Sequence, residues 1–564
     1  MTVRRPLTFP VVLAALALVA TACSTATKKA APPPTRPEFV ERIRLNGDGD
    51  FGFPSPFTHR AGRGFNRVTL LFDTLIWKDG GGTFLPWLAK EWSRSADGLE
   101  WRFTLREGVR WQDGRPLTAA DVAFTFDYLQ KGAGLQVGAS VTFRPQIEVK
   151  EVVTESPTVA VFRLDQPFAP TFFEDQVAGR VPIIPKHIWE TVTDPAKFTQ
   201  PAAAMGSGPY RLESYDASTG SYLFVANESY FLGTPYVRRI EYVPADNELL
   251  ALRVGDIDIA NIGISEEPLV EESLEPFAPP AYTQLTAPGA WNRVLHFNLT
   301  KGFPFNDKAF RQAVAYAVDR QDLVKRALLG NGEPGSAGAL APSNPWLAPD
   351  LPAYNVDVVR AKALLDGIGL TDADGDGFRD LPDGSRFRPE VLTNARHSSK
   401  TAEMIKEYLR TVGIDVSILS LDSTSADTAG RDGNYQMAIV GYANGVNGDP
   451  DLLRQRLSSA VKAKAFTRVY GWNNPAFEAA AAKQLVTLDP AERLRYVQEM
   501  QRAVAEDVPL ISLYVPTRTV VSAAAVFDGW YFTPGGIFGS LGEPDNKHVF
   551  VTGKRSGLPE GFAG

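Results

Sequence analysis

Apolar and polar residues alternate over a short stretch in the first part of the chain. Trp101, Phe103 and Leu105 are separated by polar residues, so every second side chain can enter a core. Asp97-Gly98, just before them, is typical of a hairpin turn. The pattern therefore predicts a hairpin strand with one buried face and one exposed face.

Apolar residues spaced three or four positions apart predict amphipathic helices in several places. Thr118 followed by Asp121 is a capping box, which predicts the start of one helix. Longer helices are predicted over residues 307–328 and 399–412. Asp489 precedes a proline and an acidic residue, as at a helix start. We expect the apolar side chains of this last helix to face the core: Leu494, Val497, Met500 and Val504.

Short apolar segments rich in β-branched and aromatic residues predict strands between these helices. The predicted strands are residues 39–46, 152–164, 240–243, 414–421, 436–441 and 508–515. Because strands and helices alternate along the chain, we expect an α/β fold.

The length of 564 residues predicts more than one domain, because a single hydrophobic core stops growing near about 250–300 residues. With 44% apolar and 22% charged residues, the composition is that of a soluble globular protein. A net charge of −7 gives no reason to expect nucleic acid as a partner.

The beginning of the chain has the pattern of an export signal. Arg4 and Arg5 precede an uncharged run whose core, residues 11–22, is almost entirely Val, Leu and Ala. This apolar core is shorter than the ~20 residues that span a bilayer, so a signal peptide is favoured over a transmembrane helix. Residues 1–22 are therefore predicted to be a signal peptide.

Cys23 is the only cysteine, so disulfides within the chain are excluded. It follows Leu18-Val19-Ala20-Thr21-Ala22, which resembles a bacterial lipobox, although Ala20 stands where a leucine is preferred. The resemblance implies that Cys23 is lipidated, and residues 23–37, rich in Pro and small polar residues, then form a tether. The alternative is a soluble exported protein that is cleaved near Ala22.

The region from Leu88 to Val122 combines an apolar pair, an aromatic residue, two Asp-Gly turns and a Leu-Thr-Ala-x-Asp-Val helix start. It closely resembles the signature region of the family 5 extracellular solute-binding proteins, the oligopeptide, dipeptide and nickel binding components of ABC importers. The matching positions are Leu88, Ala89, Trp92, Asp97, Gly98, Phe103, Leu105, Arg106, Gly108, Val109, Trp111, Asp113, Gly114, Leu117, Thr118, Ala119, Asp121 and Val122.

Residues 206–212, Gly-Ser-Gly-Pro-Tyr-Arg-Leu, resemble a strand of the same family. Two glycines beside Ser207 also suggest a phosphate loop or a nucleophile elbow. Neither motif fits, because no Gly-Lys-Ser/Thr is present and Ser207 lacks the Gly-x-Ser-x-Gly spacing. We therefore expect a turn that enters a strand.

The resemblance extends from about residue 39 to 530 and implies an α/β fold of two hinged lobes, that of a class II periplasmic binding protein. An extra domain is expected within the first lobe. The implied divisions are residues 38–75, 200–288 and 515–564 for lobe I, 76–199 for the inserted domain, and 289–514 for lobe II.

The stretch from Gly441 to Asp451 resembles the family loop that lines the ligand cleft. Peptide-binding members carry an aspartate there that pairs with the peptide amino terminus. This chain has Asn444, Gly445 and Val446 at the corresponding places, so an ammonium clamp is not expected. Asn444 and Asn447 are instead candidates to bind a neutral amide or a sugar hydroxyl, or are ordinary turn residues.

Other candidate ligand residues are aromatic or basic. Trp291, Asn292 and Trp472 are candidates for the cleft, with core packing as the alternative for the tryptophans. Arg396 or His397, at the end of a predicted strand, could meet a carboxylate. The predicted ligand-binding set is Trp291, Asn292, Arg396, Tyr442, Asn444, Asn447, Asp449 and Trp472.

One acidic segment follows the order of oxygen ligands in an EF-hand loop. Its candidate calcium ligands are Asp372, Asp374, Asp376, Phe378 (through its carbonyl) and Asp380. The last position holds Asp383 instead of Glu, so a hydrated Asp-Gly turn is the alternative to a structural calcium site. No other cofactor is expected.

The five histidines have no metalloprotease spacing, so we do not expect an enzyme. The resemblance implies an extracytoplasmic, monomeric binding component that delivers a solute to a membrane permease. Peptides are the first expectation for the solute, and a glycoside, an opine or a metal chelate are alternatives. An exported hydrolase with a carboxylate pair and a ligand sensor on the same fold are the competing functions.

Overall fold

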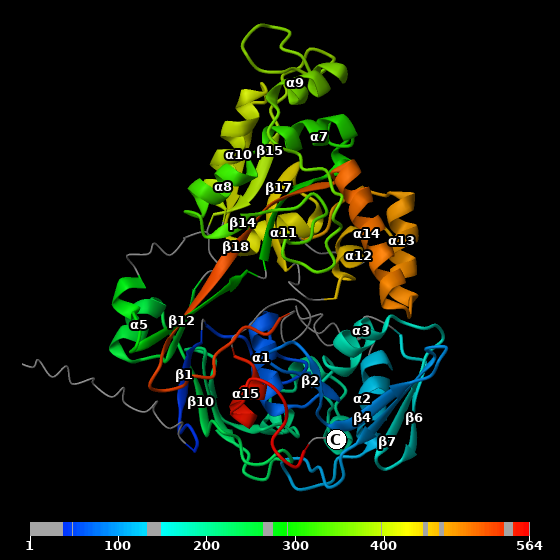
Figure 1. Ribbon diagram of the computed structural model, residues 1–564, viewed down its shortest axis with the longest axis vertical. Coiled ribbons are helices and arrows are strands. Elements are labelled where there is room, and N and C mark those ends of the chain that lie inside the picture. The colour runs from blue at the N-terminus through cyan, green and yellow to red at the C-terminus, as the bar shows by residue number, and fades with distance from the viewer. Residues whose placement is uncertain are drawn as a thin grey trace, which may run out of the picture. The chain divides into compact units, whose positions relative to one another are not determined.

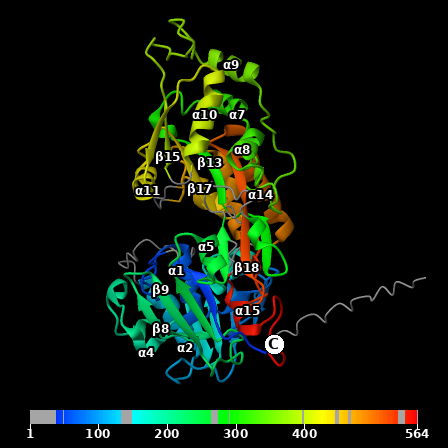
Figure 2. The ribbon, with the colours of Figure 1, turned by 90° about the vertical axis from the view of Figure 1, so that its left-hand side faces the viewer.

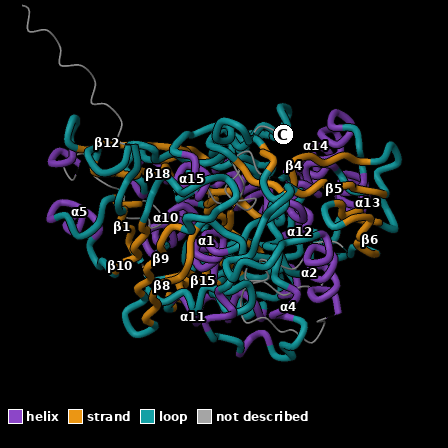
Figure 3. The backbone as a smooth tube through the Cα atoms, turned by 90° about the horizontal axis from the view of Figure 1, so that it is seen from below, coloured by secondary structure: helices purple, strands orange, loops and turns teal. Residues whose placement is uncertain are grey.

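The computed structural model describes residues 38–562 except 48, 132–147, 263–273, 290, 396–397, 444–448, 462–466 and 535–544. Mixed α/β architecture is observed throughout this part of the chain (Figures 1 and 3). Within it, no helix is long and apolar enough to cross a membrane. The predicted signal peptide, Cys23 and the tether lie outside the described residues.

One set of strands forms the sheet of the first lobe. It consists of β1 (Ile43–Asn46), β8 (Tyr210–Asp216), β9 (Ser221–Ala226), β10 (Arg239–Val243), β11 (Ile259–Ile262) and β12 (Tyr282–Pro288). Strand β1 lies parallel to β10 and β11, whereas β8, β9 and β10 form an antiparallel meander. Figure 2 shows β8 and β9 side by side.

A second set of strands forms the sheet of the second lobe. It consists of β13 (Trp291–Phe297), β14 (Gly332–Pro334), β15 (Glu390–Asn394), β16 (Ser417–Leu421) and β17 (Met437–Ala443), in the order β16-β15-β17-β13. Strands β15 and β16 are parallel, as are β15 and β17.

The long strand β18 (Leu510–Ala523) belongs to both sheets (Figure 1). Its first half pairs with β13 and β14 of the second lobe. Its second half, from Thr517, pairs with β11 and β12 of the first lobe. Strands β12 and β13 also connect the two lobes, because β12 lies in the first sheet and β13 in the second. In the sequence only Gly289 and Ala290 separate them. Two chain segments therefore connect the lobes at this crossing.

The predicted inserted region contains a separate antiparallel sheet. Its strands are β4 (Ala89–Arg94), β5 (Glu100–Leu105), β7 (Val159–Arg163) and β6 (Glu151–Ser156), in this order. The small pair β2 (Ile76–Lys78) and β3 (Phe84–Pro86) precedes it. In β5 every second residue is buried, and Gly98 has a left-handed φ of 74°, which confirms the predicted hairpin.

The helices of the first lobe and the inserted region are mostly short. They are α1 (Ala61–Leu71), α2 (Ala119–Lys131), α3 (Pro170–Phe173), the π-helix Glu174–Ala178, α4 (Lys186–Trp189), α5 (Glu248–Val254) and α15 (Lys547–Thr552). The capping box of α2 is confirmed, because the Asp121 carboxylate accepts a hydrogen bond of 2.9 Å from the Thr118 amide.

The helices of the second lobe are longer. They are α7 (Lys308–Ala317), α8 (Arg320–Ala327), α9 (Val358–Gly367), α10 (Ser399–Thr411), α11 (Ser423–Asp432), α12 (Leu452–Leu457), α13 (Pro475–Val486) and α14 (Pro490–Asp507). The predicted start of α14 is confirmed, because the Asp489 side chain accepts a hydrogen bond from the Glu492 amide. Helix α10 ends at Thr411, one residue before the predicted end, and Gly413 follows with a left-handed φ of 81°.

Three sequence predictions were wrong in detail. The helix predicted over 307–328 is two helices, because Val318 is extended and the Asp319 side chain caps a new start. The strand predicted over 152–164 is a hairpin of two strands, β6 and β7. On α14, Leu494 is only half-buried. The neighbouring Arg493 is buried instead, because an acidic partner neutralises its charge.

Hydrophobic packing follows the sheets. One core extends from Val40 to Val551 and joins the first-lobe sheet to the inserted region. Separate clusters fill the second lobe between Val294 and Tyr514. The exact domain boundaries stay a prediction, because residues on both sides of the expected boundary near position 75 share one core.

Candidate ligand-binding region

The register of the second-lobe sheet brings several predicted ligand residues to one edge. Trp291 pairs with Ala443 and Asn292 pairs with Tyr442, so β13 begins where β17 ends. Strand β15, parallel to β17, ends at the same edge, directly before the segment that contains Arg396. Ligands in open α/β sheets bind outside the carboxyl ends of strands, so this edge is the candidate binding region.

Two of the predicted ligand residues are used inside the protein. Asn292 is fully buried: its side-chain amide donates to the Ala339 carbonyl, and its oxygen accepts from Ser512 at 2.8 Å. Trp472 is buried in the core of the second lobe, where its indole N–H donates to Asp507 at 3.1 Å. These contacts support core packing for Trp472 and a structural role for Asn292.

Trp291 is half-buried and its ring flanks Gly441, so it remains accessible at the sheet edge. The backbone of Tyr442 lies in β17 beside it. Arg396, His397, Asn444 and Asn447 lie outside the described residues, so their predicted roles stay predictions.

Asp449, at the end of the predicted ligand loop, forms a buried ion pair with Arg493. Both carboxylate oxygens of Asp449 lie 2.7 Å from the guanidinium, one on each terminal nitrogen. The two side chains are only 3% and 2% exposed. A bidentate pair of this kind is strong and directional. Asp449 is therefore neutralised within the protein and is not a free acceptor for a ligand ammonium.

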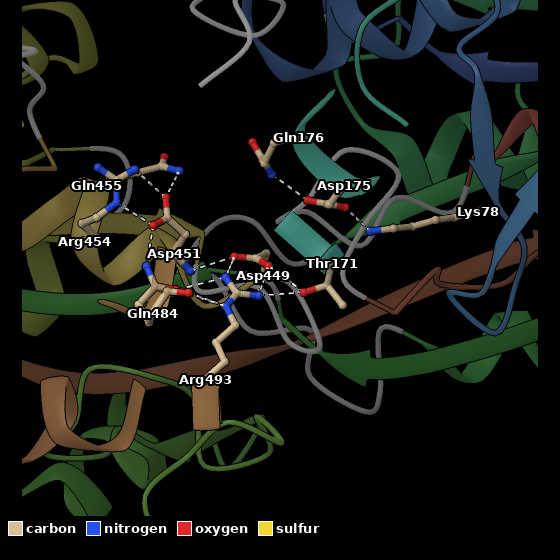
Figure 4. A network of polar contacts seen from close by, with 10 residues as sticks. All are labelled: Lys78, Thr171, Asp175, Gln176, Asp449, Asp451, Arg454, Gln455, Gln484 and Arg493. Carbon is tan, nitrogen blue, oxygen red and sulfur yellow. Dashed lines mark hydrogen bonds and ion pairs between the residues drawn. The ribbon is translucent and has the colours of Figure 1, made fainter. Parts of the chain in front are cut away.

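A hydrogen-bond network continues from this pair into the second lobe (Figure 4). The Arg493 guanidinium donates to the Gln484 side chain and main chain, and Gln484 in turn donates to Asp451 at 2.7 Å. Burial raises the pKa of Asp451, but the Arg454 charge and the hydrogen bonds from Arg454 and Gln455 outweigh it, so the net pKa is lowered. Asp451 therefore stays ionised and holds α12 beside α13.

The network also reaches the inserted region through Thr171. The Arg493 guanidinium donates to the Thr171 hydroxyl at 2.7 Å, and this hydroxyl donates to Asp449 at 3.2 Å. Neither Thr171 nor Arg493 was predicted from the sequence. The available signal for Arg493 was a charged residue among apolar ones at helical spacing on α14, whereas Thr171 gave no signal.

Figure 4 also shows a second buried ion pair, within the inserted region. Lys78 of β2 contacts the Asp175 carboxylate, whose other oxygen accepts from Gln176 at 2.6 Å. Asp175 and Gln176 belong to the π-helix that follows α3, a feature often found near functional sites.

The acidic loop that resembles an EF-hand lies apart from this region. Carboxylate oxygens of Asp372, Asp374 and Asp376 approach within 4.8 Å of one another, and all three residues are exposed. This donor set fits calcium, but the same carboxylates accept hydrogen bonds from amides of their own loop, such as Gly375. Both the calcium site and the hydrated turn fit these contacts.

The other residues of the predicted calcium set make hydrogen bonds within the protein. Asp380 is buried and accepts from the Ala373 amide at 3.0 Å. Asp383, at the last position of the loop, accepts from Ser385 of the next turn. Phe378 donates its amide to Asp376. A calcium ion at this loop stays a prediction, with Asp372, Asp374 and Asp376 as its first ligands.

Ser207, for which catalytic motifs were rejected, has a structural role. Its hydroxyl donates to the fully buried Asp73 at 3.0 Å. Asp73 also accepts from Trp87, Tyr230 and Lys547. The carboxylate is therefore saturated by donors, and the segment enters β8 as predicted.

Comparison with known proteins agrees with this architecture. A profile of the bacterial extracellular solute-binding proteins, family 5, matches residues 83–464. The nickel-binding periplasmic protein of Escherichia coli (strain K12) is 28% identical, over 65% of this chain and 69% of that protein. The oligopeptide-binding protein AppA of Bacillus subtilis (strain 168) is 26% identical, over 75% of this chain and 76% of that protein.

Solved structures share the fold. AppA from Bacillus subtilis in complex with a nonapeptide superposes with a TM-score of 0.72 at 20% identity, over 90% of this chain and all of that one. NikA from Brucella suis in complex with Fe(III)-EDTA gives a TM-score of 0.74 at 21% identity, over 89% of this chain and 100% of that one. The two-lobed fold of periplasmic binding proteins is thereby confirmed. The chain belongs to the bacterial extracellular solute-binding proteins of family 5.

Proposed function

We propose that this protein is the solute-binding component of an ABC importer and that peptides are its first class of ligand. The profile match over most of the chain carries this proposal. Relatives named for dipeptide and oligopeptide binding support peptides, and those named for nickel binding support a metal chelate as the second candidate. An opine is a third, since a structure of this fold holds agropinic acid.

Ligand capture is proposed to work by closure of the two lobes. The lobes are joined by the crossing of β18 with the β12–β13 segment, and a ligand bound between them would contact both. A ligand shifts this equilibrium only by its difference in affinity for the closed and open forms. The closed form would then dock on the permease and release the solute.

The contacts of Asp449 restrict the chemical class of ligand that we expect. Because Arg493 neutralises this carboxylate and residues 444–446 contain no acid, a free amino terminus has no predicted acidic partner in this loop. Trp291 at the sheet edge offers an apolar surface for a side chain. We therefore propose ligands recognised through amides and apolar groups, such as longer peptides held by their backbone.

The competing functions have less support. A hydrolase needs two free carboxylates close together in its cleft, but the two aspartates beside the candidate binding region, Asp449 and Asp451, are each paired with an arginine. We propose that the protein has no enzymatic activity, and turnover of peptides by the purified protein would contradict this. A ligand sensor would use the same fold, and the identity of the neighbouring genes separates it from an importer component.

We also propose that the protein is an extracytoplasmic, monomeric lipoprotein that is held at a bacterial membrane through Cys23. The apolar segment of residues 11–22 and the position of Cys23 support this proposal. Metabolic labelling with a radioactive fatty acid should label the wild type and not Cys23→Ala. A soluble wild-type protein without label would contradict the anchor.

Native mass spectrometry of protein purified without refolding tests the ligand class. We expect a series of masses above the protein mass that corresponds to retained peptides. Release by acid and sequencing of the released material would identify them. One defined small molecule in place of the series would contradict the peptide assignment and favour a chelate, a glycoside or an opine.

A further inference from the structure

Thr171 bridges two parts of the chain that are remote in sequence. Its hydroxyl accepts a hydrogen bond from Arg493 and donates one to Asp449, residues that lie 322 and 278 positions away. Thr171 belongs to α3 of the inserted region, whereas Asp449 and Arg493 belong to the second lobe. Figure 4 shows the three side chains converging.

Two further contacts accompany this bridge. The Ala169 amide donates to the Leu485 carbonyl at 2.8 Å. The Leu485 side chain, on α13, packs against the core that fills the first lobe and the inserted region. The inserted region therefore touches α13 and α14 through a backbone bond, an apolar side chain and a polar bridge.

The second-lobe half of the bridge is complete without Thr171. Arg493 and Asp449 are both almost fully buried and paired in a bidentate geometry, and Gln484 holds the guanidinium from the other side. Thr171 is exposed and supplies only one hydroxyl. A single hydrogen bond at the edge of a preformed ion pair can form and break without the loss of a buried charge.

We propose that Thr171 and the Asp449–Arg493 pair form a clasp that favours the closed arrangement of the two lobes before any ligand binds. The hydroxyl both donates and accepts, so it recognises the paired carboxylate and guanidinium together. The role of the clasp in transport depends on the proposed function, whereas its effect on the ligand-free protein does not.

Hydrogen exchange of the full chain tests the clasp, after any retained solute has been removed and native mass spectrometry detects none. The Ala169 amide is the reporter, because its acceptor Leu485 lies across the contact. The Phe173 amide is the internal control, because it bonds to Ala169 within α3. In Thr171→Val we expect Ala169 to exchange roughly fivefold faster, as one lost hydrogen bond predicts, with Phe173 unchanged.

Two matched variants separate the hydroxyl from other effects. Thr171→Ser keeps the hydroxyl and should exchange as the wild type does. Thr487→Val removes a hydroxyl that donates to the Lys483 carbonyl one helical turn earlier, and it should also match the wild type.

Equal Ala169 exchange in Thr171→Val and wild type would overturn the clasp. Equally fast exchange in Thr171→Ser and Thr171→Val would also overturn it, because the hydroxyl would then be irrelevant. Faster exchange of both Ala169 and Phe173 would show fraying of α3 and would count against the proposal. A failure of the transport role would appear separately, as the lack of any retained solute in the native mass spectrum of the protein as first purified.

Discussion

Lys547 and Asp73 form an ion pair in which neither side chain has any exposed surface. The Lys547 ammonium lies 2.8 Å from the carboxylate and over the ring of Trp77. It also donates to the main-chain carbonyls of Thr69 and Phe72. Burial lowers the pKa of Lys547, whereas the Asp73 charge raises it. The two charges are tolerated here because each has a full set of partners.

Replacing Lys547 by Met should strongly destabilise the protein. The Asp73 carboxylate would keep only neutral donors, and a buried charge left without its partner costs about 3–5 kcal/mol. Urea unfolding followed by tryptophan fluorescence measures this loss. The double variant Lys547→Met/Asp73→Asn, which removes both charges, should be less destabilised than the single one. A single variant as stable as the wild type would show that the pair is not important.

His59 makes stability depend on pH. Burial lowers its pKa to about 4 from the ordinary value of 6.5, although hydrogen bonds to the Ser55 and Pro56 carbonyls oppose the shift. Below pH 6.5 the unfolded chain binds a proton that the folded protein binds only near pH 4. Stability is therefore lost as the pH falls through this window.

In His59→Gln, the decrease in the free energy of unfolding between pH 6.5 and 4.5 should be smaller by about 2 kcal/mol. Urea unfolding of both proteins at the two pH values gives this difference directly. Each protein is compared with itself at the two pH values, so a general loss of stability in the variant does not affect the result. Equal pH dependence in the two proteins would assign the acid sensitivity to other groups.

The turn that enters β8 lies very close to the backbone at the end of α1. A Cβ on either Gly206 or Gly208 would overlap the main chain of Leu71. The Gly208 amide donates to the Leu71 carbonyl at 2.8 Å, and Ser207 between the glycines reaches Asp73. Close packing against the end of α1 therefore explains the Gly-Ser-Gly sequence without a bound ligand.

Gly208→Ala should lower the free energy of unfolding by roughly 2–4 kcal/mol, because the backbones must separate. Gly367→Ala is the matched control. Gly367 ends α9 with open space around it, so alanine should be neutral or should stabilise by up to about 1 kcal/mol. Thermal melting of the two variants against the wild type measures both effects. Similar melting temperatures for Gly208→Ala and the wild type would contradict the packing argument.

Elements with local signals could be predicted from the sequence. The β5 hairpin, the α2 capping box and the start of α14 at Asp489 each depend on residues within a few positions of one another. The break between α7 and α8 was missed, because an aspartate inside an apolar-periodic stretch is normally on the solvated face, whereas Asp319 caps a helix. Whether an aspartate inside a long periodic segment caps a helix depends on the tertiary fold.

The candidate site could be predicted only in part. The sheet edge with Trp291 and Tyr442 follows from strand register, but of its two strands only β17 was predicted from the hydrophobic pattern. The ion pair of Asp449 could not be predicted, because its partner Arg493 lies 44 positions away, on α14. Trp472 was a candidate for the cleft with core packing as the alternative, and its neighbours in the fold place it in the core. Long-range pairing decided each of these cases.

Closure of the whole molecule must act at the two segments that join the lobes. Strand β18 changes partners near Pro516, where the Gly289 amide donates to the Pro516 carbonyl at 2.7 Å. A Cβ on Gly289 would overlap this carbonyl oxygen. The crossing therefore requires glycine at position 289, and any motion of the lobes changes the backbone around it.

Gly289→Ala should impair ligand-driven closure and should also lower the free energy of unfolding, because its Cβ would overlap the Pro516 carbonyl. A ligand that binds the closed form stabilises the protein by RT ln(1 + [L]/Kd), so the rise in melting temperature reports closure. With a mixture of synthetic tri- to pentapeptides, we expect the wild type to melt several degrees higher and Gly289→Ala to gain less than half of that shift. Gly367→Ala, far from the crossing, should keep the full shift.

X-ray scattering should show peptide-dependent compaction of the wild type and little in Gly289→Ala. A full shift and full compaction in Gly289→Ala would place the hinge elsewhere in the chain.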